Sequence, residues 1–252
     1  MDTTLLRQPI EIRQVELHTP FAWLRAGLDD LRAAPLPSLF YGLCFAVIGY
    51  LLAYVLRYQP QHIAAASAGF MLLSPALAIG LYSLSQRREA GLPQRLVPTL
   101  TAWRRNLYNL LLFLLVLSVI FLVWARASLL SFAVFYAGNQ STLADLLRQI
   151  VAPDNFVFLG IWLGIGFCFA TLVFLISVTT VPMMLDRNTD AISAALTSVR
   201  VVAANLGPMA VWAAIIAWAS AAALLMGFIG IIVVGPLLGH ASWHAYRSLV
   251  GK

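Results

Sequence analysis

Apolar residues in this chain come in long, nearly unbroken runs that are separated by short polar segments. An α-helix needs about 20 apolar residues to cross the roughly 30 Å hydrocarbon core of a bilayer. Runs near that length occupy residues 37–56, 63–85, 107–124, 156–178, 206–226 and 228–246. The pattern therefore predicts an all-α, polytopic membrane protein with about six transmembrane helices.

Some boundaries in this pattern depend on weaker signals. The apolar stretch over residues 206–243 is too long for one crossing, so we place a tight hairpin near residues 227–230. Residues 127–155 begin apolar and turn polar, which predicts a partly embedded loop with a short amphipathic helix. In the fourth span, Gly160 and Gly164 have the spacing that lets two helix backbones approach closely, so we expect a packed inner helix.

A threefold repeat is visible around these spans. Each odd-numbered span follows an amphipathic segment, at residues 21–31, 96–107 and 191–202, with the narrow apolar stripe of a helix lying in the membrane interface. Each even-numbered span has a proline near its end, and these prolines are Pro75, Pro182 and Pro236. The expected architecture is three transmembrane hairpins, each preceded by an interfacial amphipathic helix. Residues 1–35 would form a cytoplasmic N-terminal segment, and residues 36–252 a single six-helix transmembrane domain.

Composition and charge support this topology and give it an orientation. Hydrophobic residues make up 61% of the chain and charged residues 10%, against about 25% charged in a typical soluble domain. Of the 16 Lys and Arg residues, all but Arg57, Arg126 and Arg148 fall on one side of the predicted topology. Cytoplasmic flanks accumulate Lys and Arg, so both termini are predicted to be cytoplasmic. The basic residues form no stripe with interleaved aromatic residues, so nucleic acid is not an expected partner.

His240 and His244 have the one ligand-like spacing in the chain. Four residues apart on a helix, they share a face, where two imidazoles could hold a metal ion or flank a haem. The alternative is that they contact lipid headgroups or the backbone at the end of the sixth span, because the sequence nearby offers no third ligand. No cofactor is assigned.

The sequence shows no signature of an enzyme. Asp, Glu, Lys and Arg are absent from all the predicted spans, although such residues mark most ion-coupled pumps and transporters. The chain also has no HExxH, GxSxG or P-loop motif. Asp29 and Asp30 are adjacent, so on a helix they point in different directions, which predicts a solvated polar face.

Four arginines next to predicted spans are candidates for binding lipid. Arg87, Arg88, Arg104 and Arg105 could each contribute about 1 kcal/mol at a surface of anionic headgroups. The positive-inside rule alone also explains their position. The lipid bilayer is the expected partner in either case.

The C-terminal run GPLLGHASWHAYR, at residues 235–247, resembles the ending of a bacterial inner-membrane family known as domain of unknown function 2189. The resemblance extends over most of the chain, from the amphipathic residues 21–32 onward. It implies a bacterial inner-membrane protein with six helices, and it assigns no activity.

Three functions are compatible with these patterns. The first is a non-catalytic protein of the inner membrane, either an accessory or scaffold partner of a larger complex or a protein that organises lipid. The second is a carrier or channel for a neutral or amphipathic solute. The third is a haem- or metal-handling protein, related to respiratory complexes, that would use His240 and His244.

Overall fold

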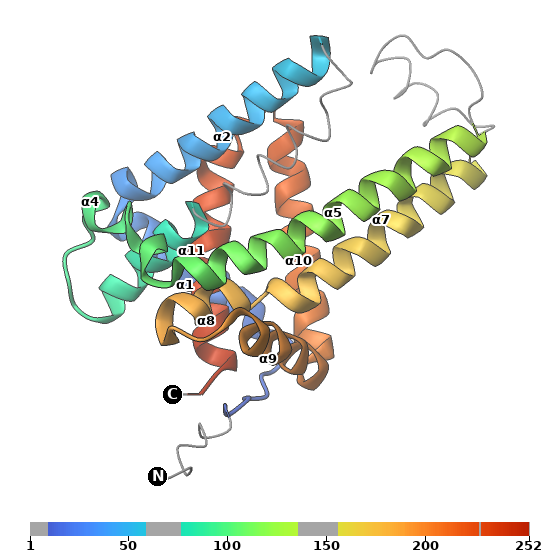
Figure 1. Ribbon diagram of the computed structural model, residues 1–252. Coiled ribbons are helices and arrows are strands. Elements are labelled where there is room, and N and C mark those ends of the chain that lie inside the picture. The colour runs from blue at the N-terminus through green and yellow to red at the C-terminus, as the bar shows by residue number, and fades with distance from the viewer. Residues whose placement is uncertain (1–9, 59–76, 136–155, 227, 252) are drawn as a thin grey trace.

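The computed structural model describes residues 10–58, 77–135, 156–226 and 228–251, and the elements in these ranges are helices (Figure 1). The expected all-α class is therefore confirmed for the described part of the chain. One antiparallel β-bridge joins Ile12 to Val250. Pro75 and most of the second predicted span lie outside the described residues.

The first two helices meet at a sharp corner. Helix α1 spans Thr19–Ala33 and helix α2 spans Pro35–Tyr58, and the two are bent by 107° relative to each other. Proline disfavours helical backbone at the residue before it and is well placed at the first position of a helix. Ala34 accordingly leaves the helical region, with φ of −135° and ψ of 65°, and Pro35 opens α2. The corner sets the axis of α1 nearly perpendicular to that of α2.

Beyond the next described segment, a helix at residues 77–89, the chain makes two short turns before a long helix. These are α4 (Leu96–Thr99) and the 3-10 helix η2 (Ala102–Asn106), where one continuous amphipathic segment was expected. Pro98 lies in the single turn of α4, where its missing N–H breaks no hydrogen bond within the helix. Helix α5 then runs from Leu107 to Phe135, so the loop predicted to begin at residue 127 is wrong up to residue 135.

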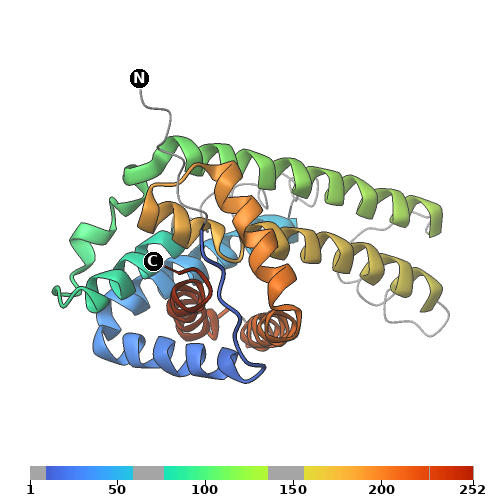
Figure 2. The ribbon, with the colours of Figure 1, turned by 90° about the horizontal axis from the view of Figure 1, so that it is seen from below.

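The fourth predicted span, residues 156–178, coincides with one helix, and a second, short helix follows it. Helix α7 (Phe156–Ser177) is followed by α8 (Thr180–Arg187), which contains Pro182 in its first turn. Among the described residues, the prediction that α7 is a packed inner helix is wrong at its glycines, because a Cβ atom added at Gly160 or Gly164 would meet none of their atoms within 4 Å. Helix α7 packs on α5 by another face, and the two run side by side away from the rest of the molecule (Figures 1 and 2).

The last three helices follow one another with short breaks. Helix α9 spans Ala191–Ala204, α10 spans Leu206–Leu225 and α11 spans Ile231–Leu249. The gap between α10 and α11 falls where the tight hairpin was placed, and Phe228 there has a positive φ of 68°. At the α9–α10 break, the Asn205 side chain accepts a hydrogen bond from Val15 N at 2.9 Å and donates to Arg13 O at 3.1 Å. It thereby ties the N-terminal segment to this corner.

Helix α11 is the centre of the described fold, with α1, α2 and α10 packed against it (Figure 2). Close approach depends on glycine, since a Cβ atom at Gly42 of α2 would lie 2.0 Å from the carbonyl oxygen of Ile232. Pro236 has no N–H and so cannot bond that carbonyl, which lies four residues before it in α11. Gly42 therefore covers the one carbonyl that the proline leaves without its helical partner.

Three helical segments are long and apolar enough to cross a membrane among the described residues, at Leu96–Ser128, Phe156–Arg187 and Leu206–Leu225. Counting the bent pair α1 and α2 as one span would give four. Helix α11 is not among them, because its second half contains two histidines and Arg247. The ends of the described chain lie together, since Arg13 N donates to Leu249 O and Gly251 N to Glu11 O, each at 2.9 Å.

Candidate functional site

A group of polar side chains is buried where α1, α2, the 77–89 helix and α11 meet. Asp30 of α1 and His240 of α11 are 3% and 1% exposed, and Ser38 and Ser85 are equally buried. Burying a polar group is costly unless it is hydrogen-bonded. We call these four residues the buried polar network.

One side of His240 is fixed by Ser38. The Ser38 hydroxyl donates its single proton to Ala34 O at 2.7 Å, so its oxygen is left to accept. His240 Nε2 lies 2.9 Å from that oxygen and must be the donor. The bond therefore assigns a proton to Nε2 of the imidazole.

The other side of His240 reaches Asp30 through Ser85. The Ser85 Oγ atom lies 2.8 Å from His240 Nδ1 and 2.5 Å from Asp30 Oδ2. Since a hydroxyl has one proton, Ser85 can donate to only one of these two atoms at a time. A second proton, on Nδ1 or on the carboxyl, would complete the chain. Ser85 thus links His240 to Asp30.

Two side chains from other helices contact the carboxylate of Asp30. Arg88 Nη1 lies 2.5 Å from Oδ1, and His244 Nε2 lies 2.9 Å from Oδ2. Burial by itself raises the pKa of Asp30, but hydrogen bonds from His244, Ser85 and Arg88 and the charge of His244 outweigh it and lower the pKa to about 2. Asp30 is therefore a carboxylate at neutral pH, buried and paired.

The sequence placed Asp30 with Asp29 on a solvated face, and this prediction is wrong for Asp30. On α1 the apolar stripe that begins at Phe21 is only partly buried, since Phe21 is 60% exposed and Leu31 is 8% exposed. The buried stripe contains Trp23, Gly27 and Asp30, at helical spacing. The glycine between an aromatic residue and an aspartate was the one available signal, because glycine inside a helix marks a close neighbour.

His240 and His244 do share a face of α11, as their spacing predicted, and both are directed at Asp30. His240 Nδ1 is 3.8 Å from Asp30 Oδ2. Within the described residues, however, no three His, Cys, Asp or Glu side chains are arranged to hold a metal ion. The ring nitrogens that face Asp30 and the serines are used in hydrogen bonds. The geometry thus favours a structural role for both imidazoles over metal binding.

The four candidate lipid-binding arginines do not form one cluster. Arg88 pairs with Asp30, whereas the Arg87 Nε atom donates to Pro93 O at 2.8 Å. Arg105 reaches the Gln86 side chain at 3.3 Å, and the Arg104 guanidinium lies over the Trp103 ring at 5.2 Å from its centroid. Only Arg88 joins the buried polar network.

A second group of paired charges lies nearby, where α8 and the 77–89 helix meet the end of α11. Asp186 accepts hydrogen bonds from Tyr246 Oη at 2.7 Å and Arg247 Nη1 at 3.3 Å. Glu89 accepts from Arg247 Nε and from Trp243 Nε1, each at 3.1 Å. These bonds hold α8 and α11 together at the end of the molecule where the described chain begins and ends.

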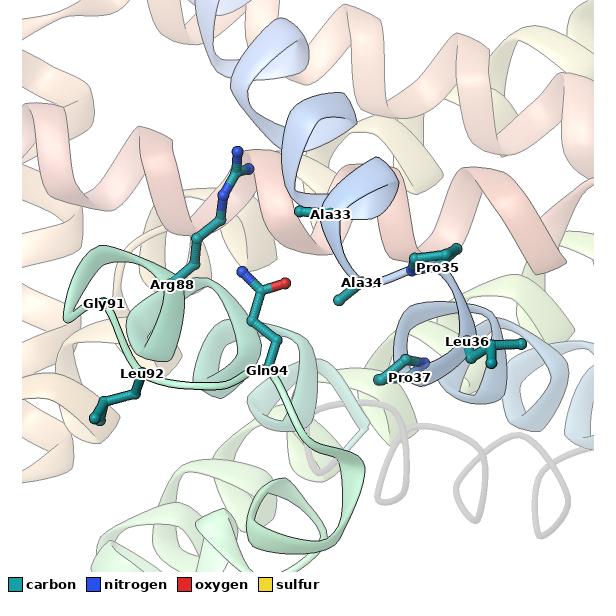
Figure 3. A pocket seen from close by; sticks show the side chains of 9 residues that line it. All are labelled: Ala33, Ala34, Pro35, Leu36, Pro37, Arg88, Gly91, Leu92 and Gln94. Carbon is teal, nitrogen blue, oxygen red and sulfur yellow. The ribbon is translucent and has the colours of Figure 1, made fainter.

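A pocket of about 520 Å³ opens beside the buried polar network (Figure 3). It lies between the α1–α2 corner at Pro35 and the loop at residues 91–94. Arg88 and Gln94 supply its polar side chains, and most of the remaining wall is alanine, proline and leucine. The Gln94 Oε1 atom is buried and has no hydrogen-bond partner among the described residues, so it is not open to the pocket. The pocket thus combines one cation with an apolar wall.

Residues 63–186 match the model of a family described as predicted integral membrane proteins, DUF2189. The resemblance expected from the sequence is therefore confirmed, on residues other than the C-terminal run that suggested it. Neither the curated proteins nor the solved structures include a match to the chain.

Proposed function

We propose that this chain is a non-catalytic protein that organises phospholipid at one face of the bacterial inner membrane. The observation that supports it is the pocket at the α1–α2 corner, where Arg88 lies beside an apolar wall. A corner between an interfacial helix and a span lies at the depth of lipid headgroups. A cation there attracts lipid phosphate.

The surroundings of the corner suit a membrane interface. Phe21 on α1, Leu36 at the start of α2 and Val97 in α4 are 60%, 80% and 76% exposed, respectively. Large apolar side chains left exposed around a cleft mark a surface that another apolar phase covers. At the boundary between α1 and α2, that phase is the upper part of the acyl chains.

Hydrolysis by the Ser38–His240 pair is disfavoured by the direction of its hydrogen bonds. A serine nucleophile must give its proton to the imidazole and must be reached by the substrate. Ser38 instead donates to Ala34 O and receives from His240, and both residues are at most 1% exposed. This arrangement suits a structural role that fixes the α1–α2 corner against α11.

A carrier is disfavoured by the packing of the described centre. Met209, Trp212, Trp243 and Tyr246 fill it, and each is at most 1% exposed. Protein interiors packed in this way have few voids larger than a water molecule. A solute path through these helices would require several of the largest side chains in the chain to move.

The test is whether phospholipid stays with the purified protein and stabilises it. We expect the full chain, extracted in mild detergent, to retain phospholipid, to lose thermal stability when it is stripped, and to regain it when lipid is added back. Ala33→Trp, which fills the pocket from its wall, should reduce the retained lipid. If no lipid is retained, or a membrane protein co-purifies in equal amount instead, the lipid function is replaced by the accessory one.

A further inference from the structure

We infer that one acyl chain of the phospholipid held at the α1–α2 corner runs along α2 and ends in a second, apolar groove near the middle of that helix. This inference rests on the proposed lipid function and adds where the tail of the lipid binds. It depends on three observations: an exposed apolar stripe on α2, the position of the groove along that helix, and the backbone conformation of one residue in the groove wall.

The apolar stripe leads from the corner pocket along α2. It begins at Leu36, which lines the pocket, and continues through Phe40, Leu43 and Val47. Spacings of three and four residues place these side chains on one face of the helix. They are 80%, 39%, 52% and 48% exposed, so the stripe is open along its length. A hydrocarbon chain that starts at the pocket can therefore lie on α2 without displacing a described side chain.

The stripe ends in a groove of about 250 Å³ between α2 and the start of α11. Val47 and Leu51 border it on the α2 side, and Phe228 and Ile232 border it on the other. Its lining contains no charged residue among those that the structure describes, whereas Arg88 lines the corner pocket. The groove therefore suits a hydrocarbon chain and the corner pocket suits a phosphate.

The separation of the two cavities matches the depth of one leaflet. Val47 lies about three helical turns beyond Leu36, which is about 16 Å along α2 at 1.5 Å per residue. The hydrocarbon core is roughly 30 Å thick, so an acyl chain of one leaflet reaches about 15 Å below its headgroup. A lipid whose phosphate lies at Arg88 therefore brings the end of its chain to the groove.

Phe228 forms a wall of the groove in a strained conformation. Its φ of 68° lies in the left-handed region, which bulky residues rarely adopt. Its ring lies against α2 at Gly49, where an added Cβ atom would be 2.7 Å from a ring carbon. Strained residues of this kind persist where the surrounding structure fixes them, and they are concentrated at ligand clamps and other functional sites. The contact of Phe228 with Gly49 thus holds the groove in shape beside Val47.

The length of the acyl chain tests the inference. Delipidated full-length protein in detergent would be titrated with phosphatidylglycerol carrying two palmitoyl or two octanoyl chains, and binding would be followed by native mass spectrometry. The octanoyl chain is half as long and ends on α2 before Val47. We expect the palmitoyl lipid to bind about tenfold more tightly, because the outer half of its chain gains dispersion contacts in the groove. Equal affinities would overturn the inference and leave the lipid function standing, whereas failure of both lipids to bind would remove both.

Val47→Trp separates binding in the groove from the general affinity of longer chains for apolar surroundings. The indole fills the groove from its α2 side, so the palmitoyl lipid should lose its advantage of about tenfold, while binding of the octanoyl lipid should not change. Val119→Trp is the matched control, since Val119 of α5 is 52% exposed and lies outside the groove. It should keep the wild-type preference. A palmitoyl preference that Val47→Trp retains would overturn the inference.

Photolabelling tests whether a single lipid joins the two cavities. Palmitoyl phosphatidylglycerol with a diazirine at the end of one chain should label residues 46–51 and 228–232 in the wild type. Ala33→Trp, which fills the corner pocket, should reduce this labelling together with the retained lipid. If labelling of the groove stayed at the wild-type level in Ala33→Trp, the groove would take a lipid of its own, and the inference would be overturned.

Discussion

The half of the molecule centred on α11 and the hairpin of α5 and α7 are built from similar apolar helices but are packed in opposite ways. Around α11, glycines face backbone, as Gly42 faces Ile232, and polar side chains from four segments meet inside. In the hairpin, a Cβ atom added at Gly160 or Gly164 would meet no described neighbour within 4 Å, and Phe167 is 72% exposed. Apolar composition therefore brings a helix into the bilayer, but packing depends on what lies opposite each position.

We expect the largest difference in the free energy of unfolding between substitutions of two adjacent aspartates of α1, Asp29 and Asp30. Asp30→Ala leaves Arg88, His244 and Ser85 without their shared partner, and breaking a buried ion pair typically costs about 3 to 5 kcal/mol. We expect a loss near the lower figure, since Arg88 is 39% exposed and water can solvate it. Unfolding in detergent would measure it. Asp29→Ala should change the free energy of unfolding by less than about 0.5 kcal/mol, and equal effects would contradict the buried network.

Next in size is the effect of adding a methyl group to glycines of the two regions. Gly42→Ala places a Cβ atom against the Ile232 carbonyl, so α2 and α11 must separate, at a cost of about 2 kcal/mol. Gly164→Ala meets no neighbour and should be neutral or stabilising by up to about 1 kcal/mol, through helix propensity. Melting temperatures of the two variants, compared with the wild type, would test this. If Gly164→Ala lowered the melting temperature and Gly42→Ala did not, α7 rather than α2 would be the closely packed helix.

Acid should act on the α11-centred half through Asp30. An aspartate in an unfolded chain titrates near 3.9, whereas the pKa of Asp30 in the folded chain is about 2. A lowered pKa means that the stability contributed by Asp30 is complete above about pH 5 and is lost as the pH falls through about 2. Melting curves of the wild-type protein, measured between pH 6 and pH 2, should show this loss of stability. In Asp30→Asn this part of the acid dependence should be absent, and an unchanged profile would remove Asp30 as its source.

The smallest effect is expected inside the α5–α7 hairpin. Trp162 of α7 donates to the Ser128 hydroxyl of α5 at 2.7 Å. Interhelical hydrogen bonds in membrane proteins contribute about 0.6 kcal/mol on average, so Ser128→Ala should cost about that much. Ser118→Ala, which removes a hydroxyl bonded to its own helix, is the matched control. A loss above about 2 kcal/mol would mean that the hairpin is more tightly packed than its exposed side chains indicate.

Helix positions were largely predictable from the sequence, because apolar length and proline are local signals. The break between α10 and α11 falls at the predicted glycines, and the α1–α2 corner falls at Pro35. The end of α5 was not predictable in this way, because Arg126 looked like the end of a span and the helix continues past it to Phe135. A single charge does not end a helix whose backbone bonds are intact.

The site was less predictable from the sequence, because it depends on which faces of the helices pack against one another in the folded chain. Asp29 and Asp30 are indistinguishable by composition, and only the position of α11 decides which one is buried. His240 and His244 were recognised from their spacing, but their shared partner comes from more than 200 residues earlier in the chain. Of the four candidate arginines, Arg88 alone lines the large pocket, since the fold directs each neighbour to a different partner.

The bridge between Ile12 and Val250 has a consequence for topology that does not depend on hydropathy. Two residues that share backbone hydrogen bonds lie on the same side of a membrane, so the chain between them must cross it an even number of times. The three apolar helices that pass a length test cannot therefore be the whole set, whereas four or six crossings satisfy the rule. The pairing of Ile12 with Val250 thus requires an even number of membrane crossings between these two residues.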